Sequence, residues 1–217
     1  MRPKALLFDL DGTLLDSVSN ILKANRETFD LMKLRLSDED SRNAIGIPLE
    51  VQARRFAGDR AEEFIETYRQ VFRKYADNEA RLFPGAVEAL DRVRSRGCLT
   101  ALVTSKNSRA TQRVLGKSGL DGRFDVVITA DDVTNPKPHP EPILKALEVL
   151  DVRPGEAVFV GDSLFDVEAS NLAGVRMIGV SWGAKTREEL MAGSVAAAAD
   201  TWEELVTWLD AEPQPWQ

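Results

Sequence analysis

Short, continuous runs of apolar residues recur along the chain, and segments with helical spacing separate them. Five runs are rich in strand-forming residues, at positions 5–8, 100–103, 126–129, 157–160 and 176–180. Because these runs do not alternate with polar residues, both faces of each strand should be buried. Strands buried on both faces are typical of a parallel sheet covered by helices on each side. We therefore predict an α/β fold, a doubly wound, Rossmann-like parallel sheet.

The segments between these runs repeat apolar residues every three or four positions, as amphipathic helices do. Such repeats cover residues 87–93, 110–115 and 143–150, and Gly97 and Gly119 follow the first two. A glycine just beyond the last apolar residue favours the end of a helix. Strands alternating with helices predict right-handed crossover connections within one sheet.

Residues 17–80 interrupt this alternation with two helical stripes and no strand of comparable quality. One stripe runs through residues 21–36 and the other through residues 64–75. The alternation resumes after residues 82–85, where proline and glycine break regular structure. The predicted organisation is a core domain of residues 1–15 and 82–217 and a helical cap domain of residues 16–81.

The composition is that of a globular protein with an acidic balance. The chain has 217 residues, of which 43% are hydrophobic, and its 35 acidic and 28 basic residues give a net charge of -7. This charge disfavours nucleic acid and anionic membranes as partners. No apolar run is long enough to cross a bilayer. We expect a cytoplasmic protein, and its oligomeric state, monomer or homodimer, stays open.

Polar side chains follow the predicted strands at their carboxyl ends, where open parallel sheets bind ligands. They are Asp9 and Asp11 after the first strand, Thr104 and Ser105 after the second, Lys137 after the third, and Asp162 and Asp166 after the fourth. Carboxylates gathered at one point repel unless a cation lies among them, and oxygen ligands without His or Cys favour Mg²⁺. A lysine and hydroxyls would complete a phosphate pocket, in which an aspartate could attack phosphorus. The residues themselves thus indicate phosphoryl transfer.

Several of these residues also have an ordinary structural explanation. Asp162 could cap the helix that follows it, and Asp166 could be an acid of the first helical turn. Lys137, taken alone, could be a solvated loop lysine. Asp16 and Ser17 are expected to cap the first helix of the insertion rather than to touch a substrate.

Four segments, FDLDGTLLDS, VTS, PKP and GDSLFD, occur in an order that resembles the four motifs of the haloacid dehalogenase superfamily. The resemblance covers nearly the whole chain and includes a helical cap inserted after the first strand. It implies a hydrolase that forms an aspartyl-phosphate and depends on Mg²⁺.

The resemblance implies a role for each catalytic residue. Asp9 would be the nucleophile, and Asp11 would protonate the leaving alkoxide and then activate water. Thr104 would hydrogen-bond the transferring phosphoryl group, assisted by the backbone amide of Ser105. Lys137 would neutralise charge on the nucleophile and on the phosphate.

The resemblance also implies a set of metal ligands. Mg²⁺ would be held by the carboxylate of Asp9, the backbone carbonyl of Asp11 and the carboxylate of Asp162. Asp166 would lie close by or act through water.

Single positions narrow the expected chemistry within the superfamily. Dehalogenases lack the second acid after the nucleophile, whereas Asp11 is present. Sugar-phosphate mutases with this cap usually carry a histidine at about the position of Ile21, so a mutase is not expected. The chemistry that fits is hydrolysis of a phosphate ester.

The segment 44–50 is similar to the cap specificity loop of phosphoglycolate phosphatase-like enzymes. Gly46 in this loop and Arg42 before it are the substrate-binding candidates, and Arg54 and Arg55 flank the loop. A small phosphorylated metabolite would benefit from such cations. We therefore expect a Mg²⁺-dependent phosphatase of small phosphomonoesters, most similar to phosphoglycolate phosphatase.

Other functions stay open at this point. Within the same superfamily, pyrophosphate, sugar phosphates and nucleotides are alternative substrates. A different class is a signalling receiver module phosphorylated on Asp131 or Asp132, which follow the third strand. A catalytically inactive binding protein of the same fold is a third possibility.

Overall fold

The computed structural model describes residues 2–35, 37, 40, 44–78 and 81–210. Its centre is one all-parallel sheet with the strand order β3-β2-β1-β4-β5-β6. The strands are β1 (Ala5–Phe8), β2 (Leu99–Val103), β3 (Val126–Ile128), β4 (Ala157–Gly161), β5 (Arg176–Val180) and β6 (Ala197–Ala199). The predicted doubly wound α/β fold is confirmed.

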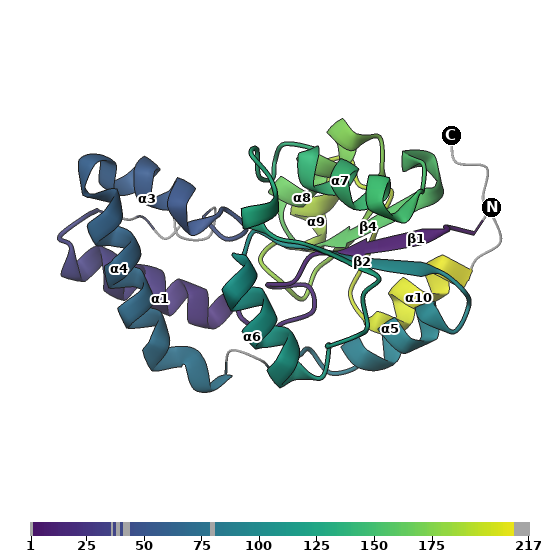
Figure 1. Ribbon diagram of the computed structural model, residues 1–217, viewed down its shortest axis with the longest axis horizontal. Coiled ribbons are helices and arrows are strands. Elements are labelled where there is room, and N and C mark those ends of the chain that lie inside the picture. The colour runs from purple at the N-terminus through teal and green to yellow at the C-terminus, as the bar shows by residue number, and fades with distance from the viewer. Residues whose placement is uncertain (1, 36, 38–39, 41–43, 79–80, 211–217) are drawn as a thin grey trace.

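Helices cover both faces of the sheet (Figure 1). One face carries α5 (Ala86–Arg94), α6 (Ser108–Ser118) and α10 (Trp202–Asp210). The other carries α7 (Glu141–Leu150), α8 (Leu164–Ala173) and α9 (Arg187–Ala192). Short 3₁₀ turns complete the core at η3 (Ala130–Asp132) and η4 (Pro154–Glu156).

Strand β1 shows why its residues form a fully buried strand. Leu6 and Phe8 pack into the cluster beneath α5, α6 and α10, whereas Ala5 and Leu7 pack into the cluster beneath α7 and α8. Successive side chains of a strand point to opposite faces, so an uninterrupted apolar run fills both layers. All four residues are at most 1% exposed.

One strand and one core helix of the structure were missing from the sequence-based prediction. Strand β6 consists of alanines, which have weak strand propensity, and it forms because it pairs with β5 at the edge of the sheet. The short helix α9 begins with a capping box in which Thr186 accepts a hydrogen bond from the backbone of Glu189.

A separate group of helices extends from the carboxyl end of the sheet (Figure 1). It contains α1 (Val18–Leu31), α3 (Leu49–Ala57) and α4 (Ala61–Phe72), with η1 (Gly58–Arg60) and η2 (Arg73–Asn78). Its own apolar cluster is built around Phe29, whose ring meets Phe56 and Phe64 edge to face at centroid distances of 5.3 and 5.4 Å. The two apolar stripes predicted for this region correspond to α1 and α4. The division into two domains stays a prediction.

Within the described ranges, no helix combines the length and the apolar character that a membrane crossing requires.

Candidate active site

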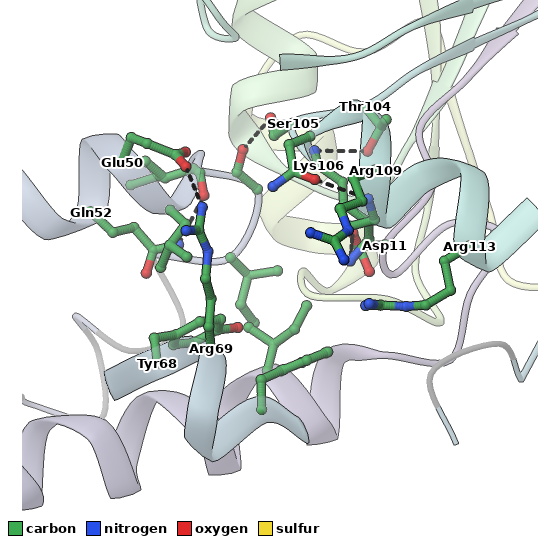
Figure 2. A pocket seen from close by; sticks show the side chains of 18 of the residues that line it. Asp11, Glu50, Gln52, Tyr68, Arg69, Thr104, Ser105, Lys106, Arg109 and Arg113 are labelled. Atoms are coloured by element: carbon green, nitrogen blue, oxygen red, sulfur yellow. Dashed lines mark hydrogen bonds and ion pairs between the residues drawn. The ribbon is translucent and has the colours of Figure 1, made fainter. Parts of the chain in front are cut away.

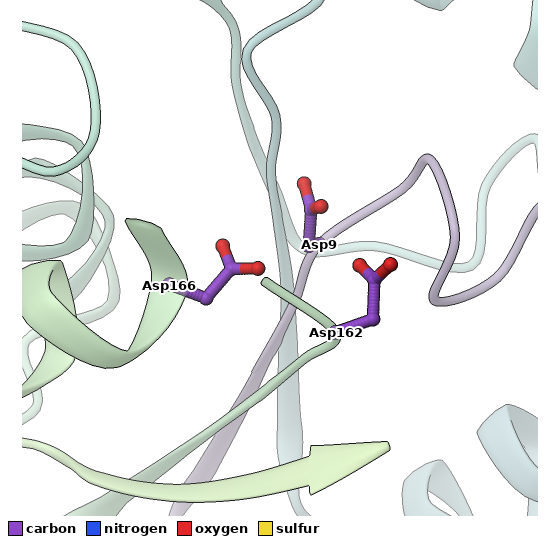
Figure 3. A group of neighbouring side chains, drawn as sticks. All are labelled: Asp9, Asp162 and Asp166. Carbon is purple, nitrogen blue, oxygen red and sulfur yellow. The ribbon is translucent and has the colours of Figure 1, made fainter. Parts of the chain in front are cut away.

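Three carboxylates converge at the carboxyl end of the sheet (Figure 3). Asp9 follows β1, Asp162 follows β4, and Asp166 lies in the first turn of α8. One oxygen of each lies within 4.8 Å of the others, and the three residues are at most 4% exposed. Strand β1 lies where the strand order reverses, the point at which open α/β sheets form a ligand crevice.

Lys137 provides a buried positive charge inside this group of acids. Its Nζ lies 2.9 Å from Oδ1 of Asp9 and 2.6 Å from Oδ1 of Asp166, and it donates to the carbonyl of Val103 at 3.2 Å. Burial alone would lower the pKa of this ammonium group, but Asp166 and Asp9 raise it. Lys137 is therefore a fixed cation and not a solvated loop lysine.

The nucleophile candidate, Asp9, is held in an environment that disfavours its charge. Burial raises its pKa to about 7 against the pull of Lys137, and the charge of Asp166 contributes to the increase. Its backbone amide donates to the carbonyl of Val160 and so continues the sheet ladder. One cation thus offsets only part of the cost of burying these carboxylates.

Asp162 is fixed by hydrogen bonds from two other loops. Thr13 Oγ1 donates to its Oδ1 at 3.1 Å, and the amide of Ala184 donates to its Oδ2 at 2.6 Å. Burial, followed by the charges of Asp9 and Asp166, raises its pKa well above the usual range. Three mutually repelling buried carboxylates, with no thiolate or imidazole beside them in this group, fit a hard divalent cation such as Mg²⁺.

Glycine lets the first motif approach Asp162 closely. Gly12 has a φ of 83°, and a Cβ added to it would lie 2.1 Å from Oδ2 of Asp162. A larger residue would displace this carboxylate, so both the turn and the close contact require glycine.

Asp166 is bonded both to the start of α8 and to Lys137, and its expected contact with the metal stays a prediction. Its Oδ2 accepts from the amide and hydroxyl of Ser163 at 3.1 and 2.6 Å, which completes the capping box of α8. Its Oδ1 accepts from Lys137. A Cβ on Gly161 would meet the Asp166 carboxyl carbon at 2.7 Å, so this arrangement also needs a glycine. Asp166 therefore positions Lys137 from a helix cap.

Asp11 lies outside the buried group and faces a cavity. Ser17 Oγ donates to its Oδ1 at 2.8 Å, and Lys106 Nζ lies 3.1 Å from its Oδ2. The expectation that Ser17 caps the first helix of the insertion is wrong, because Ser17 stands at the N-cap of α1 but its side chain makes no capping bond there. Asp16 pairs loosely with Arg81 at 3.7 Å.

Sequence reasoning missed Lys106 as a site residue. It follows Thr104 and Ser105 directly and is about as buried as Asp11, with 14% of its side chain exposed. Its Nζ also lies 5.7 Å from the centre of the Phe72 ring of α4. The available signal was its position in the loop at the end of β2, where side chains point to the ligand edge.

The second motif connects the sheet to the loop before α3. Thr104 is buried and its Oγ1 accepts from the amide of Lys106 at 3.1 Å, whereas Ser105 Oγ donates to the carbonyl of Gly46 at 2.7 Å (Figure 2). Gly46 has a φ of 90°, and an added Cβ would lie 3.1 Å from Oγ of Ser163. The structure thus brings Gly46 against two of the predicted motifs.

The cap loop is held in place by a buried amide. Gln52 of α3 donates through Nε2 to the carbonyls of Ala44 and Ile47, at 3.0 and 2.8 Å. Arg42, the other substrate-binding candidate, lies outside the described residues. Arg54 and Arg55 are exposed and do not line the cavity beside Asp11.

That cavity, of about 790 Å³, lies between the sheet edge and α1, α3 and α4. Asp9, Asp11, Thr104 and Ser105 line it on the core side, and Ile21 lines it on the side of α1. The cations that line it are Arg69 of α4, Arg73 of η2, Lys106, and Arg109, Arg113 and Lys117 of α6. The cavity joins the reaction centre to a basic wall (Figure 2).

The acids after the third strand stabilise the starts of η3 and α6. Asp132 accepts from the amide and hydroxyl of Thr129 at 2.8 and 2.6 Å, and Asp131 accepts from the amide of Ser108 at 2.9 Å. These contacts lower the pKa of Asp132, the side-chain hydrogen bond from Thr129 being the largest cause. Both acids therefore have structural partners.

Comparison with known proteins agrees with this geometry. Residues 6–180 match the family model described as haloacid dehalogenase-like hydrolase. A Bacillus cereus protein named pyrophosphatase PpaX is 36% identical over 193 residues, which cover 88% of this chain and 89% of the relative.

Solved structures give the same result. A Lactobacillus plantarum protein named "putative phosphoglycolate phosphatase" superposes with a TM-score of 0.83 and 26% identity, covering 95% of this chain and 99% of that one. A hydrolase from Pseudomonas syringae gives a TM-score of 0.86 with 25% identity, covering 97% and 100%. The chain belongs to the haloacid dehalogenase-like hydrolase family.

Proposed function

We propose that this protein is a Mg²⁺-dependent phosphatase that hydrolyses small phosphorylated metabolites through an aspartyl-phosphate on Asp9. The observation that carries the proposal is the pairing of a buried Asp9, held by Lys137, with Asp11 at the wall of the same cavity. In this proposal one carboxylate attacks phosphorus, and the second exchanges a proton with the leaving group.

In the first step, a carboxylate oxygen of Asp9 attacks phosphorus and the bond to the ester oxygen breaks. Asp11 gives its proton to the departing alkoxide, so the alcohol leaves neutral. In the second step, Asp11 takes a proton from water, whose oxygen attacks phosphorus and releases Asp9 and inorganic phosphate. Each proton that Asp11 gives is recovered, so the enzyme returns to its starting state.

The surrounding residues stabilise charge during both steps. Lys137 neutralises Asp9 and the phosphoryl oxygens, while Asp166 holds the ammonium group in place. Asp9, the Asp11 carbonyl and Asp162 would hold Mg²⁺. When bound, the ion supplies positive charge against the phosphoryl oxygens. Thr104, at the end of β2, would donate its hydroxyl to the same group.

The helices over the cavity would limit the access of water. The contact between Ser105 and Gly46 joins the second motif to the loop that Gln52 holds. Closure of this loop would exclude bulk water during formation of the aspartyl-phosphate and would present residues that distinguish leaving groups.

The test is a screen for phosphate release with Mg²⁺ across glycolate, sugar and nucleoside phosphates and pyrophosphate. Asp9→Asn serves as the blank, because it removes the nucleophile and keeps the shape of the side chain. We expect release from at least one ester that disappears in Asp9→Asn. Release that is equal in both proteins for every compound would overturn the proposal.

Pyrophosphate is a second candidate substrate, favoured by the names of curated relatives such as the Bacillus cereus pyrophosphatase. Phosphoglycolate is favoured by the cap-loop segment and by the name of the Lactobacillus plantarum structure. The ratio of kcat/KM for the two compounds, measured under the same conditions, decides between them.

A further inference from the structure

One wall of the cavity carries a row of cations that the proposed chemistry at Asp9 does not use. Arg109, Arg113 and Lys117 line the cavity from α6. Their spacing of four residues puts them on one face of the helix. Figure 2 shows Arg109 and Arg113 extending into the space between α6 and the cap helices. With a rise of about 1.5 Å per residue, the row is about 12 Å long.

The opposite wall has cations of its own, but acids already balance them. Arg69 of α4 lies 3.4 Å from Glu50 of α3, and Arg73 of η2 lies 3.8 Å from Glu66 of α4. All four of these residues line the cavity. The wall formed by α3, α4 and η2 is therefore close to neutral.

The remaining acids that line the cavity also have partners. Asp11 pairs with Lys106, and Asp131 accepts from the backbone of Ser108. Among the side chains that the structure describes, Arg109 and Lys117 form no ion pair. An anionic ligand would therefore meet available charge on α6.

A row of solvated surface cations would be the simpler explanation if α6 faced open solvent on this side. Instead, the row starts just after the second motif, and its side chains share a cavity of about 790 Å³ with Asp9 and Asp11. A cavity of several hundred Å³ is the size of a metabolite site, much larger than one phosphate group needs. The cavity and the cationic side chains that line it therefore extend away from the reaction centre along α6.

We propose that Arg109, Arg113 and Lys117 bind a second phosphate group at the far end of the leaving group. This inference rests on the proposed phosphatase activity and names its substrate class, an elongated metabolite that carries two phosphates. A phosphate has a charge of about -1.5 to -2 at neutral pH and suits several cations, and the arginine fork can bind it through two hydrogen bonds. In pyrophosphate and phosphoglycolate the two anionic groups are close together. When one of them lies at Asp9, the other is too near to reach along the row of cations on α6.

The test uses linear diols, from ethanediol to hexanediol, as molecular rulers. For each diol, kcat/KM is measured for the bisphosphate and for the monophosphate, with Mg²⁺ present. The bisphosphate preference is the kcat/KM of the bisphosphate divided by that of the monophosphate. In the wild-type protein we expect this ratio to rise with the length of the diol. The rise should exceed the advantage that a bisphosphate has because either of its two equivalent ends can react. The gain should appear mainly in KM, because the distal phosphate does not react.

The variants Arg109→Gln, Arg113→Gln and Lys117→Gln are compared one at a time. Each is expected to reduce the bisphosphate preference, by about tenfold for the arginine nearest the distal phosphate, since a charge-assisted contact is lost. Arg54→Gln is the matched control, because Arg54 is an exposed cap arginine that does not line the cavity. The control should keep the wild-type preference.

A wild-type preference that does not change with chain length would overturn the inference. If the α6 variants lowered kcat/KM equally for monophosphates and bisphosphates, that result would overturn the inference too. Neither result affects the phosphatase proposal if the monophosphates are hydrolysed above the Asp9→Asn blank. Absence of hydrolysis for every diol ester overturns the second site, while the broader phosphate screen separately decides the phosphatase activity.

Discussion

Lys137 Nζ lies 2.9 Å from Oδ1 of Asp9, and both side chains are almost completely buried. The same ammonium group lies 2.6 Å from Asp166, so one cation serves two carboxylates. A buried charge that loses its partner is costly, because neither water nor another cation replaces it. Lys137 should therefore support both the folded state and the reaction.

Replacing Lys137 by Met tests this dual role. Loss of the ammonium group should lower the free energy of unfolding by about 3–5 kcal/mol, because two carboxylates remain buried without it. It should also lower kcat by about a hundredfold or more, because a fixed cation no longer stabilises the transferring phosphoryl group. Urea unfolding and steady-state kinetics measure the two effects. Lys23→Met, at an exposed position of α1, is the control, and a Lys137→Met protein with wild-type kcat would contradict the electrostatic role.

Mg²⁺ should raise the melting temperature, and the increase should depend on Asp162 and on pH. The pKa of Asp9 rises from 3.8 to about 7 in the folded protein, chiefly through burial. The contribution of Asp9 to the stability of the metal-free protein is therefore fully present below the unfolded pKa and is lost as pH rises through the folded pKa. We expect Mg²⁺ to stabilise more at about pH 8 than at about pH 5, since more of the carboxylates are then charged.

Thermal unfolding with and without Mg²⁺ measures this difference. Asp162→Asn should remove most of the Mg²⁺-dependent increase, whereas Asp59→Asn at an exposed cap position should retain it. Equal increases in all three proteins would argue against a metal site at these carboxylates.

Ser17→Ala should impair catalysis without unfolding the protein. Ser17 Oγ donates to Asp11 Oδ1 at 2.8 Å and so orients the carboxyl group proposed as the proton donor. Loss of this contact should lower kcat by about tenfold and change KM little, because proton transfer depends on geometry. Circular dichroism and steady-state kinetics are the measurements, with Ser95→Ala at an exposed position as the control. An unchanged kcat would show that Lys106 alone orients Asp11.

Gly46→Ala should reduce kcat/KM more than Gly58→Ala. Both glycines have positive φ, 90° and 55°, so each alanine pays a backbone cost of about 1 kcal/mol. Only at Gly46 would the new methyl group meet a site residue, Oγ of Ser163 at 3.1 Å, whereas nothing lies within 4 Å at Gly58. The pair therefore separates backbone strain from obstruction of the cap loop, and equal kcat/KM values would contradict docking of this loop in the reactive state.

Much of the core could be predicted from sequence because the strong signals are local. Apolar runs located β1, β2, β4 and β5 within a residue of their observed bounds, since strands buried on both faces need continuous apolar residues. Strand β6 and helix α3 could not be found in this way. The alanines of β6 have little intrinsic preference for a strand, and residues before α3 resembled a loop more than the start of a helix.

The candidate site shows the same difference between features that local sequence patterns indicate and features that they do not. The position of Asp9, Asp162 and Lys137 at one edge of the sheet follows from the sequence, because the carboxyl ends of parallel strands meet there. Other contacts are visible only in the folded protein: Ser17 and Lys106 hold Asp11, Ser105 contacts Gly46, and the cations of α6 face the cap. These contacts depend on how two separately packed groups of helices meet across a cavity, and no local pattern of residues encodes that placement.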